Sequence, residues 1–296
     1  MRANQDETLW RRKIFGVIDL KGGRAVRAIA GDRDRYQPVR LADAPDGDAI
    51  RLARGYCDWG VGGLYIADLD AICHGSGDSL ETLGKLLRFP VPIWCDRGLR
   101  GFDDVDHFEI KSLLERRSAA AAAAATGAHG RIAGEPSWDI VWIIPTEKLD
   151  ASLSVSMLPE ELPPNRETPA NSSLLPHPIS LRWAAGIDLR DGALLCREGE
   201  ARGSTPSASI APLWAAGFTR FCVIDLAAVG TGKGPTTEEI CREIRSRYPD
   251  AKLLAGGGGR GIADFQGWWE CGCDAVLSAT WLQAEIAVSE NWEINV

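Results

Sequence analysis

Two aspartates stand at matching points of a motif that occurs twice in this 296-residue chain. Asp19 lies near the end of an apolar run and precedes a glycine-containing turn, and Asp188 repeats that arrangement in the second half. Two carboxylates that face one small substrate are sufficient for proton transfer, because one can abstract a proton while the other delivers one. Aspartates also commonly cap turns, which is the structural alternative. Because the motif is duplicated, we predict that Asp19 and Asp188 are catalytic.

A run of four glycines at positions 256–259 is the second chemical signal. Glycine lets backbone N–H groups approach an anion closely, and the start of a following helix adds a positive dipole. The alternative is a flexible glycine loop that binds nothing. We predict a phosphate site here, composed of Gly257, Gly258, Gly259, Ser278, Ala279 and Thr280.

Further polar and glycine residues follow other apolar runs, so they are candidate substrate ligands. The acidic members have an alternative role, because a carboxylate at the end of a strand can simply pair with a nearby arginine. The arginines are of interest because a guanidinium binds phosphate through a planar fork of donors. This candidate group is Asp68, Asp70, Arg97, Gly98, Arg100, Thr146, Asp225, Gly230 and Thr231.

Eight apolar segments must position these residues. Some have no polar interruption, as in Ile-Val-Trp-Ile-Ile at 140–144, which suits parallel strands covered on both faces. Stretches long enough for helices separate the segments, and this alternation favours a barrel or a doubly wound sheet. The predicted strands are 14–20, 63–68, 91–96, 140–145, 183–189, 220–225, 252–256 and 274–278.

The two halves of the chain repeat one another in the same order, and this decides between the two folds. The matched segments are IDLKGG (18–23) and IDLRDG (187–192), LYIADL (64–69) and FCVIDL (221–226), DRGLRG (96–101) and GGGGRG (256–261), and the Asp-to-Thr stretches 139–146 and 274–280. The repeat predicts an α/β fold, a single (βα)8 TIM barrel made of two similar half-barrels. We expect one domain over 1–296, with half-barrels at 13–149 and 181–290.

In such a barrel the active site lies at the carboxyl ends of the strands, and a phosphate site after strands seven and eight is a recurrent feature. Both chemical signals fall at those positions. Two insertions interrupt the pattern. The alanine-rich stretch within 119–134 reads as a helix extension and surface insertion, and 150–180, rich in Pro, Ser and Asn, reads as a flexible loop or linker.

The composition excludes several classes of function. A net charge of -8 argues against a broad basic footprint for nucleic acid, and no apolar run approaches the length of a membrane span. The polar start of the chain lacks the apolar core of a secretory signal, so we predict a cytoplasmic protein without a nucleic-acid or membrane partner. The eight cysteines are mostly scattered singly, and the pair Cys271 and Cys273 has no second pair or histidine at metal-site spacing. We therefore expect reduced thiols and no metal.

Several of these motifs together resemble the strand-end signatures of a known family. They are IDLKGGRAVR (18–27), ADLDA (67–71), IDLR (187–190), VGT (229–231) and the glycine run. The chain looks like the phosphoribosylformimino-aminoimidazole carboxamide ribotide isomerase of histidine biosynthesis, with the related cyclase barrel as a cousin. By this resemblance Asp19 would be the general base and Asp188 the general acid of an Amadori-type aldose–ketose rearrangement. The substrate would be a small phosphorylated metabolite held by phosphates at both ends, and no cofactor is implied.

Positions in both halves depart from that family's pattern. Asp96 and Arg97 stand where a glycine-rich turn is usual, and Pro145 has no N–H to offer a phosphate. After the sixth strand, Ile224 and Val229 replace a threonine and an aspartate. We therefore predict that phosphate binds at the second-half site first, with little or none near Asp96 and Pro145.

Three functions remain open from the sequence. The chain is a histidine-pathway isomerase, a paralogue acting on another small phosphorylated substrate such as one in the synthesis of a one-carbon carrier cofactor, or a non-catalytic barrel that binds a metabolite. The sequence does not fix the oligomeric state, and a monomer is compatible with it.

Overall fold

The computed structural model describes residues 9–40, 46–75, 77–100, 112–113, 115–120, 139–146, 181–195 and 205–290. Its strands are β1 (Ile14–Lys21), β2 (Arg24–Arg27), β3 (Gln37–Pro38), β4 (Gly63–Asp68), β5 (Ile93–Asp96), β6 (Ile140–Pro145), β7 (Leu181–Arg190), β8 (Ala193–Leu194), β9 (Arg220–Asp225), β10 (Lys252–Gly256) and β11 (Ala275–Ser278). Its helices are the 3-10 helix η1 (Arg33–Arg35) and the α-helices α2 (Ala49–Trp59), α3 (Leu69–His74), α4 (Leu80–Leu86), α6 (Pro206–Ala215), α7 (Glu238–Arg247), α8 (Ile262–Glu270) and α9 (Thr280–Glu290).

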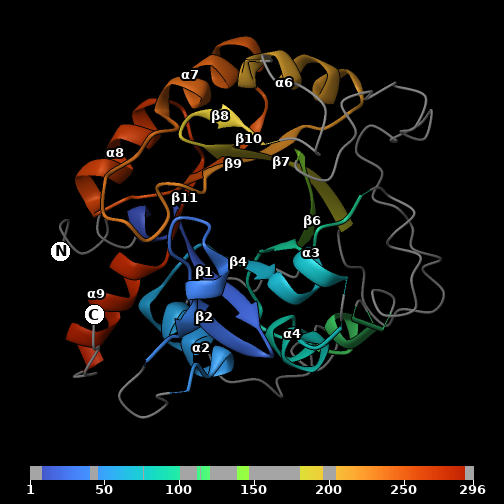
Figure 1. Ribbon diagram of the computed structural model, residues 1–296, viewed down its shortest axis with the longest axis vertical. Helices are drawn as coiled ribbons and strands as arrows, with labels where there is room; N and C mark the ends of the chain where they lie inside the picture. Colours follow the sequence, from blue (N-terminus) through green and yellow to red (C-terminus); the bar gives the residue numbers. More distant parts are fainter. Residues whose placement is uncertain are drawn as a thin grey trace.

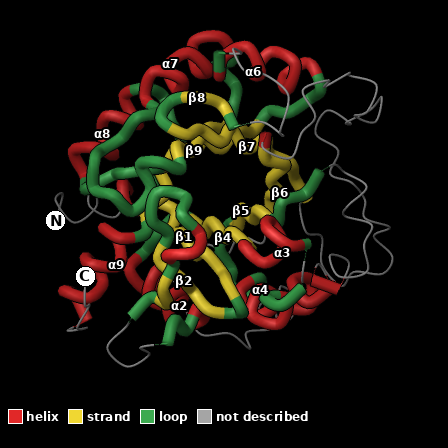
Figure 2. Tube along the Cα trace, viewed as in Figure 1, coloured by secondary structure: helices red, strands yellow, loops and turns green. Residues whose placement is uncertain are grey.

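Eight of the strands form a closed parallel barrel, in the order β1, β4, β5, β6, β7, β9, β10, β11 and back to β1. Figures 1 and 2 show this ring with the helices around its outside. The predicted TIM barrel is therefore confirmed. The ring order also fixes which strands face each other, since strands four places apart lie on opposite sides. β1 is opposite β7, β5 is opposite β10, and β6 is opposite β11.

The strand side chains alternate between two apolar layers, as the pleat requires. On β6, Val141 and Ile143 belong to the inner cluster, whereas Ile140, Trp142 and Ile144 pack in the layer that includes the helices. Both layers need apolar residues, which explains why the sequence of this strand has no polar interruption.

Short hairpins extend β1 and β7 beyond the barrel. β2 returns antiparallel to β1 and pairs Val26 with Asp19, and β8 does the same beside β7. The first turn uses Gly22 and Gly23, both with positive φ, and the second uses Asp191 and Gly192, also with positive φ. The sequence did not predict these strands, because segments of two to four residues carry too little periodic signal.

Some strand ends differ from the predicted ones for identifiable reasons. β5 begins at Ile93 rather than at 91, because Pro92 has no N–H to donate to a neighbouring strand. β11 begins at Ala275, and the side chain of Asp274 instead accepts hydrogen bonds from the Arg245 side chain at 2.8 Å and from the Leu253 N–H at 2.9 Å. Of the two predicted insertions, only Ala119 and Ala120 are described, as helix, and 121–134 and 150–180 lie outside the described residues.

Arg117, in the helical segment 115–120, is fully buried near the amino ends of β5 and β6. One terminal nitrogen donates to the Leu87 and Phe89 carbonyls at 2.7 and 3.3 Å, and the other to the Val91 and Asp139 carbonyls at 3.0 and 2.9 Å. A buried guanidinium is costly unless its donors are satisfied, and here four carbonyls satisfy them. This arginine joins the chain before β5 to the chain before β6.

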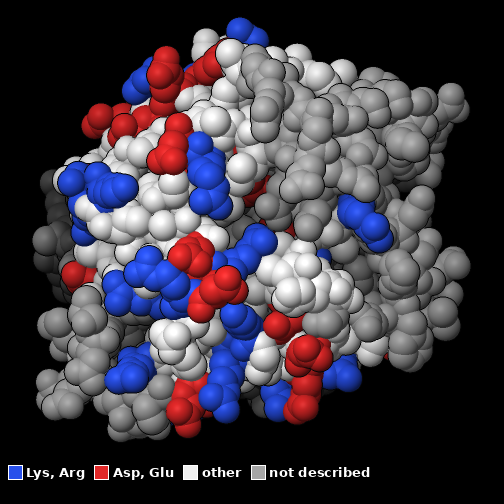
Figure 3. All heavy atoms as spheres, in the orientation of Figure 1, with Lys and Arg blue, Asp and Glu red and all other residues white. Residues whose placement is uncertain are grey.

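The described residues contain no helix that is long and apolar enough to cross a membrane. Positive and negative side chains are intermingled over the face shown in Figure 3. Among the described cysteines, seven are free thiols, and no cluster of His, Cys, Asp and Glu in the described ranges is arranged to hold a metal ion.

Candidate active site

A cavity of about 710 Å³ opens at the carboxyl ends of the barrel strands. Side chains along each strand point alternately into and out of the barrel. The residues that reach the cavity are therefore the inward-facing ones nearest the strand end. The predicted site residues among its lining are Asp19, Asp188, Gly257, Gly258, Gly259, Ser278, Ala279, Thr280, Gly230 and Thr231. Asp96, Arg27, Arg33 and Tyr65 line the same cavity.

Asp19 and Asp188 enter the cavity from opposite sides, since β1 and β7 are opposite in the ring. Asp188 is 8% exposed, and its backbone N–H donates to the Thr146 hydroxyl at 3.2 Å, which ties the end of β6 to β7. A ligand in the centre of the barrel would lie between the two carboxyl groups.

The environment of Asp19 favours the protonated acid more than water does. Burial raises the pKa of Asp19 to about 7, and the positive charge of Arg33 opposes this rise only in part. A carboxyl group that titrates near neutral pH is well matched to the work of a general base, because it is ionised for part of the time and still basic enough to take a proton.

The glycine loop after β10 has the conformation that its sequence predicts. Gly257 and Gly258 have φ values of 105° and 83°, a backbone conformation that residues other than glycine rarely adopt. A Cβ on Gly258 would also stand 2.3 Å from the Gly234 carbonyl oxygen, and a Cβ on Gly259 would stand 2.8 Å from the Phe265 ring. The glycines are therefore required both by the turn and by close packing, and they leave the backbone exposed to the cavity.

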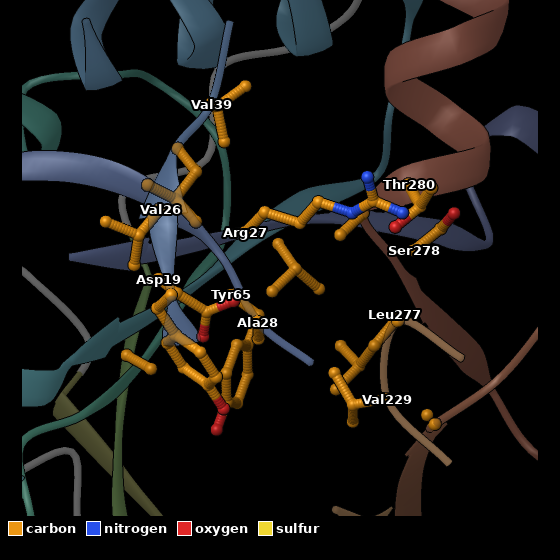
Figure 4. A pocket seen from close by; sticks show the side chains of 18 of the residues that line it. Asp19, Val26, Arg27, Ala28, Val39, Tyr65, Val229, Leu277, Ser278 and Thr280 are labelled. Atoms are coloured by element: carbon orange, nitrogen blue, oxygen red, sulfur yellow. The ribbon is translucent and has the colours of Figure 1, made fainter. Parts of the chain in front are cut away.

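Strand β11 adds polar groups to the same end of the cavity. Ser278 is only 5% exposed and borders the cavity, yet its hydroxyl has no hydrogen-bond partner within the described part of the chain. A buried hydroxyl without a partner is unusual and suggests a missing ligand. Thr280 follows at the start of α9, where helix N–H groups are unpaired. Figure 4 shows the Arg27 side chain reaching from β2 toward Ser278 and Thr280.

The opposite end of the cavity is built differently. Asp96 ends β5, lines the cavity and is 7% exposed. Its Oδ1 accepts the Gly98 N–H at 2.8 Å, so the backbone donor that follows this strand is already used within the chain. Pro145 ends β6 and has no N–H. The end formed by β5 and β6 therefore presents a carboxylate where the end formed by β10 and β11 presents glycines and hydroxyls.

Comparison with known proteins identifies the family. The family model described as "Histidine biosynthesis protein" matches residues 13–124 and 177–286, which together cover most of the chain. This chain belongs to the histidine biosynthesis protein family. The two matched segments hold both aspartates and the whole glycine loop.

Relatives within the histidine biosynthesis family differ in how much of the chain they match. An uncharacterized protein of Methanocaldococcus jannaschii is 28% identical over 269 residues, which is 90% of this chain and 92% of that protein. Two proteins named 1-(5-phosphoribosyl)-5-((5-phosphoribosylamino)methylideneamino) imidazole-4-carboxamide isomerase, from Clostridium kluyveri and Listeria monocytogenes, are 32% and 31% identical over 96 and 105 residues. Those two alignments cover only 38% and 41% of the isomerases' own length. The chain is thus similar to proteins named as isomerases over about a third of its length.

The other acidic candidates of this family member form internal contacts. Asp68 is fully buried, accepts the Arg97 Nε–H at 2.9 Å and caps α3 through the Ala71 N–H. Burial raises the pKa of Asp68, and Arg97 opposes that rise. Arg97 is itself 7% exposed, and the lining of the cavity includes neither Arg97 nor Asp68. Arg100 is exposed.

Asp70 and Asp225 hold the two hairpin turns. Asp70 accepts the Gly22 N–H at 2.8 Å and the Ser79 hydroxyl at 2.5 Å. Asp225 accepts the N–H groups of Asp191 and Gly192 at 3.1 and 2.9 Å, together with two donors of its own loop, Ala227 N–H and Thr236 Oγ1–H. These contacts position the segments that follow Asp19 and Asp188.

The loop of Gly230 and Thr231 lies against the first half at the rim of the cavity. A Cβ on Gly230 would stand 2.1 Å from the Ala28 carbonyl oxygen, and the Val229 carbonyl accepts the Ala30 N–H at 2.8 Å. The loops of the two halves therefore meet over the site.

Sequence reasoning did not select three residues that line the cavity, Arg27, Arg33 and Tyr65. Arg27 ends β2 of the unpredicted hairpin, and Tyr65 stands inside an apolar run that was predicted only as a strand. Strand alternation offered a signal for Tyr65, because it has the same parity as Asp19 when β1 and β4 are placed in register.

Proposed function

We propose that this protein is an acid–base isomerase of a small phosphorylated metabolite, in which Asp19 and Asp188 exchange protons with the substrate. One observation carries the proposal. Two carboxyl groups from opposite strands share a cavity with a glycine loop, a helix start and an unpartnered buried hydroxyl. The family membership is in keeping with it, since relatives carry the names of isomerases.

In the proposed reaction Asp188 protonates the ring oxygen of a cyclic aldose derivative, and the ring opens. Asp19, as carboxylate, removes the proton from the carbon next to the former aldehyde carbon, which gives an enediol. The protonated Asp19 then returns a proton to the former aldehyde carbon, and the hydroxyl on the neighbouring carbon releases its proton to Asp188, so the ketose forms and both carboxyl groups are restored. The pKa of about 7 keeps Asp19 basic enough for this step near neutral pH. The phosphate supplies binding energy that fixes the reacting carbon between the two carboxyl groups.

The phosphate is proposed to bind at the Gly257–Gly259 loop with Ser278 and Thr280. Backbone N–H groups, the Ser278 hydroxyl and the start of α9 offer donors there, and the reach of Arg27 adds a positive charge. The opposite end holds Asp96, whose charge repels a second phosphate. A substrate with a single phosphate is therefore favoured over the bisphosphate of the histidine pathway.

The histidine-pathway reaction itself is the second candidate, because the family model and the names of the partial relatives point to it. A small phosphorylated substrate is also in keeping with the predicted cytoplasmic location, which stays a prediction.

Solvent exchange tests the proposal across a range of candidate aldose phosphates. The purified protein is incubated in D2O with compounds such as ribose 5-phosphate, and deuterium entering the carbon next to the aldehyde is followed by NMR. We expect incorporation with wild-type protein and none with Asp19→Asn. Phosphate binding without exchange in any aldose phosphate would instead support a non-catalytic barrel.

Complementation separates the two candidate substrates. Growth of a histidine auxotroph that lacks the isomerase, with this chain expressed, would establish the histidine-pathway reaction. Failure of growth with abundant folded protein, together with deuterium exchange in a monophosphate, would support the single-phosphate substrate.

A further inference from the structure

The cavity continues past the barrel wall at the end of β11. In the parallel pairing of β1 with β11, Ser278 is the partner of Gly16, so both positions face the same side of the sheet. A Cβ on Gly16 would collide with the Tyr56 ring of α2, which shows that this side faces the helices. Leu277 belongs instead to the inner apolar cluster. Because Leu277 and Ser278 both line the cavity, one part of it lies inside the barrel and a second part lies between β11 and the helices.

This second part, which we call the outer pocket, runs along α9 and α2. On α9, Thr280, Gln283 and Ala284 are three and four residues apart, so they share one face of the helix, and all three line the cavity. The outer pocket is lined by Ile18, Leu52, Ser278, Trp281, Gln283 and Ala284. Apolar walls with a few polar groups are typical of small-molecule sites.

Two side chains of the outer pocket are held in place by contacts within the protein. The Gln283 side-chain amide donates to the hydroxyl of the fully buried Tyr56 at 3.0 Å. The Trp281 ring meets the Phe265 and Trp59 rings edge to face, with centroids 5.0 and 6.0 Å apart. Such ring pairs stabilise a fixed orientation. The outer pocket therefore has a preformed aromatic wall.

Buried polar groups mark the place where the two parts of the cavity meet. Ser278 is 5% exposed, and among the described residues neither its hydroxyl nor the buried Nε of Arg27 has a hydrogen-bond partner. Figure 4 shows the Arg27 side chain reaching toward Ser278 and Thr280, whereas Leu277 lies nearer to Val229. Buried donors of this kind usually have partners, and a guanidinium beside a hydroxyl suits an anion.

The place of this anion decides which kind of phosphate fits. A phosphate bound by the glycine loop, Ser278 and Thr280 has the barrel interior on one side and the outer pocket on the other. A terminal phosphate would leave the outer pocket empty, whereas a phosphodiester extends into both parts. The whole cavity measures about 710 Å³, within the range of about 300–1,000 Å³ that encloses drug-sized ligands. It therefore has room for a group beyond the phosphate.

We propose that the outer pocket binds an aromatic group esterified to the phosphate, so that the ligand is a phosphodiester with an aldose in the barrel and an aromatic ring between α2 and α9. The inference rests on the proposed function for the aldose and the phosphate, and it adds the group beyond the phosphate. The ring packs against Leu52, Ala284 and the indole of Trp281, and Arg27 pairs with the single negative charge of the diester.

The phenyl and methyl phosphodiesters of D-ribose 5-phosphate test the outer pocket. They carry the same aldose and the same charge, so they differ only in the ring. Calorimetry gives their affinities, together with those of D-ribose 5-phosphate and inorganic phosphate. We expect the phenyl diester to bind about 10-fold more tightly than the methyl diester, because the ring removes more apolar surface from water.

Variants of α9 locate the preference. Ala284→Phe fills the outer pocket and leaves the barrel interior unchanged, so we expect it to bind the two diesters equally and to keep the wild-type affinity for D-ribose 5-phosphate. Glu285→Phe adds the same ring at an exposed position of the helix and is the matched control that keeps the preference. A crystal structure with the phenyl diester gives a second readout, with the ring expected beside Leu52 and Trp281.

The outcomes distinguish this inference from the proposed function. Equal wild-type affinities for the two diesters, or rejection of both while D-ribose 5-phosphate binds, would overturn the aromatic site and leave the phosphate site standing. An unchanged preference in Ala284→Phe, or a ring found inside the barrel, would also overturn it. Absence of binding by every phosphate would overturn both proposals. Preferential binding of the phenyl diester without deuterium exchange in any aldose phosphate would support the aromatic site and overturn only the isomerase.

Discussion

The loops after β5 and β10 occupy opposite places in the ring and offer a ligand opposite chemistry. Both turn through a glycine with positive φ at the third position, Gly98 in one and Gly258 in the other, and in the second loop Gly257 also has positive φ. In the first loop the Asp96 side chain accepts the glycine N–H, whereas in the second no side chain fills the turn. An aspartate at the end of β5 therefore makes the first loop anionic, whereas the glycine at the end of β10 leaves the second loop without a side-chain charge at that position.

The ends of β1 and β7, by contrast, are alike, because each supplies one carboxyl group to the same cavity. The two halves of the barrel are thus alike at the proposed proton-transfer groups and unlike at the two ends proposed to face a ligand. This difference separates what any acid–base reaction needs from what selects one substrate.

Removing either of the two aspartates is expected to have the largest effect, a loss of turnover. Asp19→Asn and Asp188→Asn should each lower turnover by about 100-fold or more, the usual consequence of removing a general base or acid. Turnover of the substrate found by deuterium exchange gives the measurement, with Asp58→Asn as the control. A near-normal rate in either variant would break the equivalence and leave the acid–base role to other groups.

The hairpin turns offer a second contrast, in stability. Asp225 accepts four hydrogen bonds and Asp70 accepts two, so Asp225→Ala leaves more donors unsatisfied. We expect losses of about 2–3 kcal/mol for Asp225→Ala and about 1–2 kcal/mol for Asp70→Ala in the free energy of unfolding. Urea denaturation measures both. The opposite ranking would mean that these bonds do not determine the stability of the turns.

Substitutions of two matching threonines test whether phosphate binds at only one of the two opposite ends of the cavity. Thr280→Ala should weaken the binding of inorganic phosphate by about 10-fold, because one hydroxyl donor is lost at the glycine loop. Thr146→Ala, at the matching place in the first half, should leave phosphate affinity unchanged, although loss of its contact with the Asp188 N–H will cost some stability. Calorimetric titration gives both affinities, and equal weakening would place phosphate at both ends.

A further contrast concerns the charge state of Asp19. Its pKa is about 7 in the folded protein, above the ordinary value of 3.8, so the folded state binds the proton more tightly than the unfolded chain does. The stability from the neutral form is complete below about pH 4 and is lost as the pH rises through 7. Asp19→Asn should therefore match wild-type stability at pH 4 and exceed it at pH 8.

Denaturation at the two pH values checks this result, and a pH–rate profile provides a second readout. Wild-type turnover should rise with pH through about 7 as Asp19 ionises. A rate that is flat between pH 5 and 8, or an Asn variant that is less stable at pH 8, would contradict the assigned environment.

The sequence predicted the barrel because its information is spread over many residues. Apolar strands such as β6 and four matched segments all point to the same ring, and no single residue decides it. Likewise the cavity positions of Asp19, Asp188 and the glycine loop follow from their places at strand ends.

Individual side-chain contacts were beyond that kind of reasoning. Asp68 aligns with Asp225, yet the hydrogen bond to the hairpin turn in the first half comes from Asp70, because Asp68 pairs with Arg97. This exchange depends on where one arginine on the next strand points. Arg27 was missed for a related reason, since its place in the cavity depends on a hairpin too short to leave a periodic pattern.

The buried guanidinium of Arg117 bears on how this barrel tolerates changes in length. It donates hydrogen bonds to the carbonyls of residues 87, 89 and 91 before β5 and of residue 139 before β6. These contacts hold the starts of the two strands together, and the alanine-rich insertion lies between the two strands in the sequence. The register of β5 against β6 is then fixed at the amino-terminal ends of the two strands, independently of how many residues lie between them in the sequence. A longer or shorter insertion would then leave Asp96, at the other end of β5, in place. The insertion can therefore change in evolution independently of the cavity.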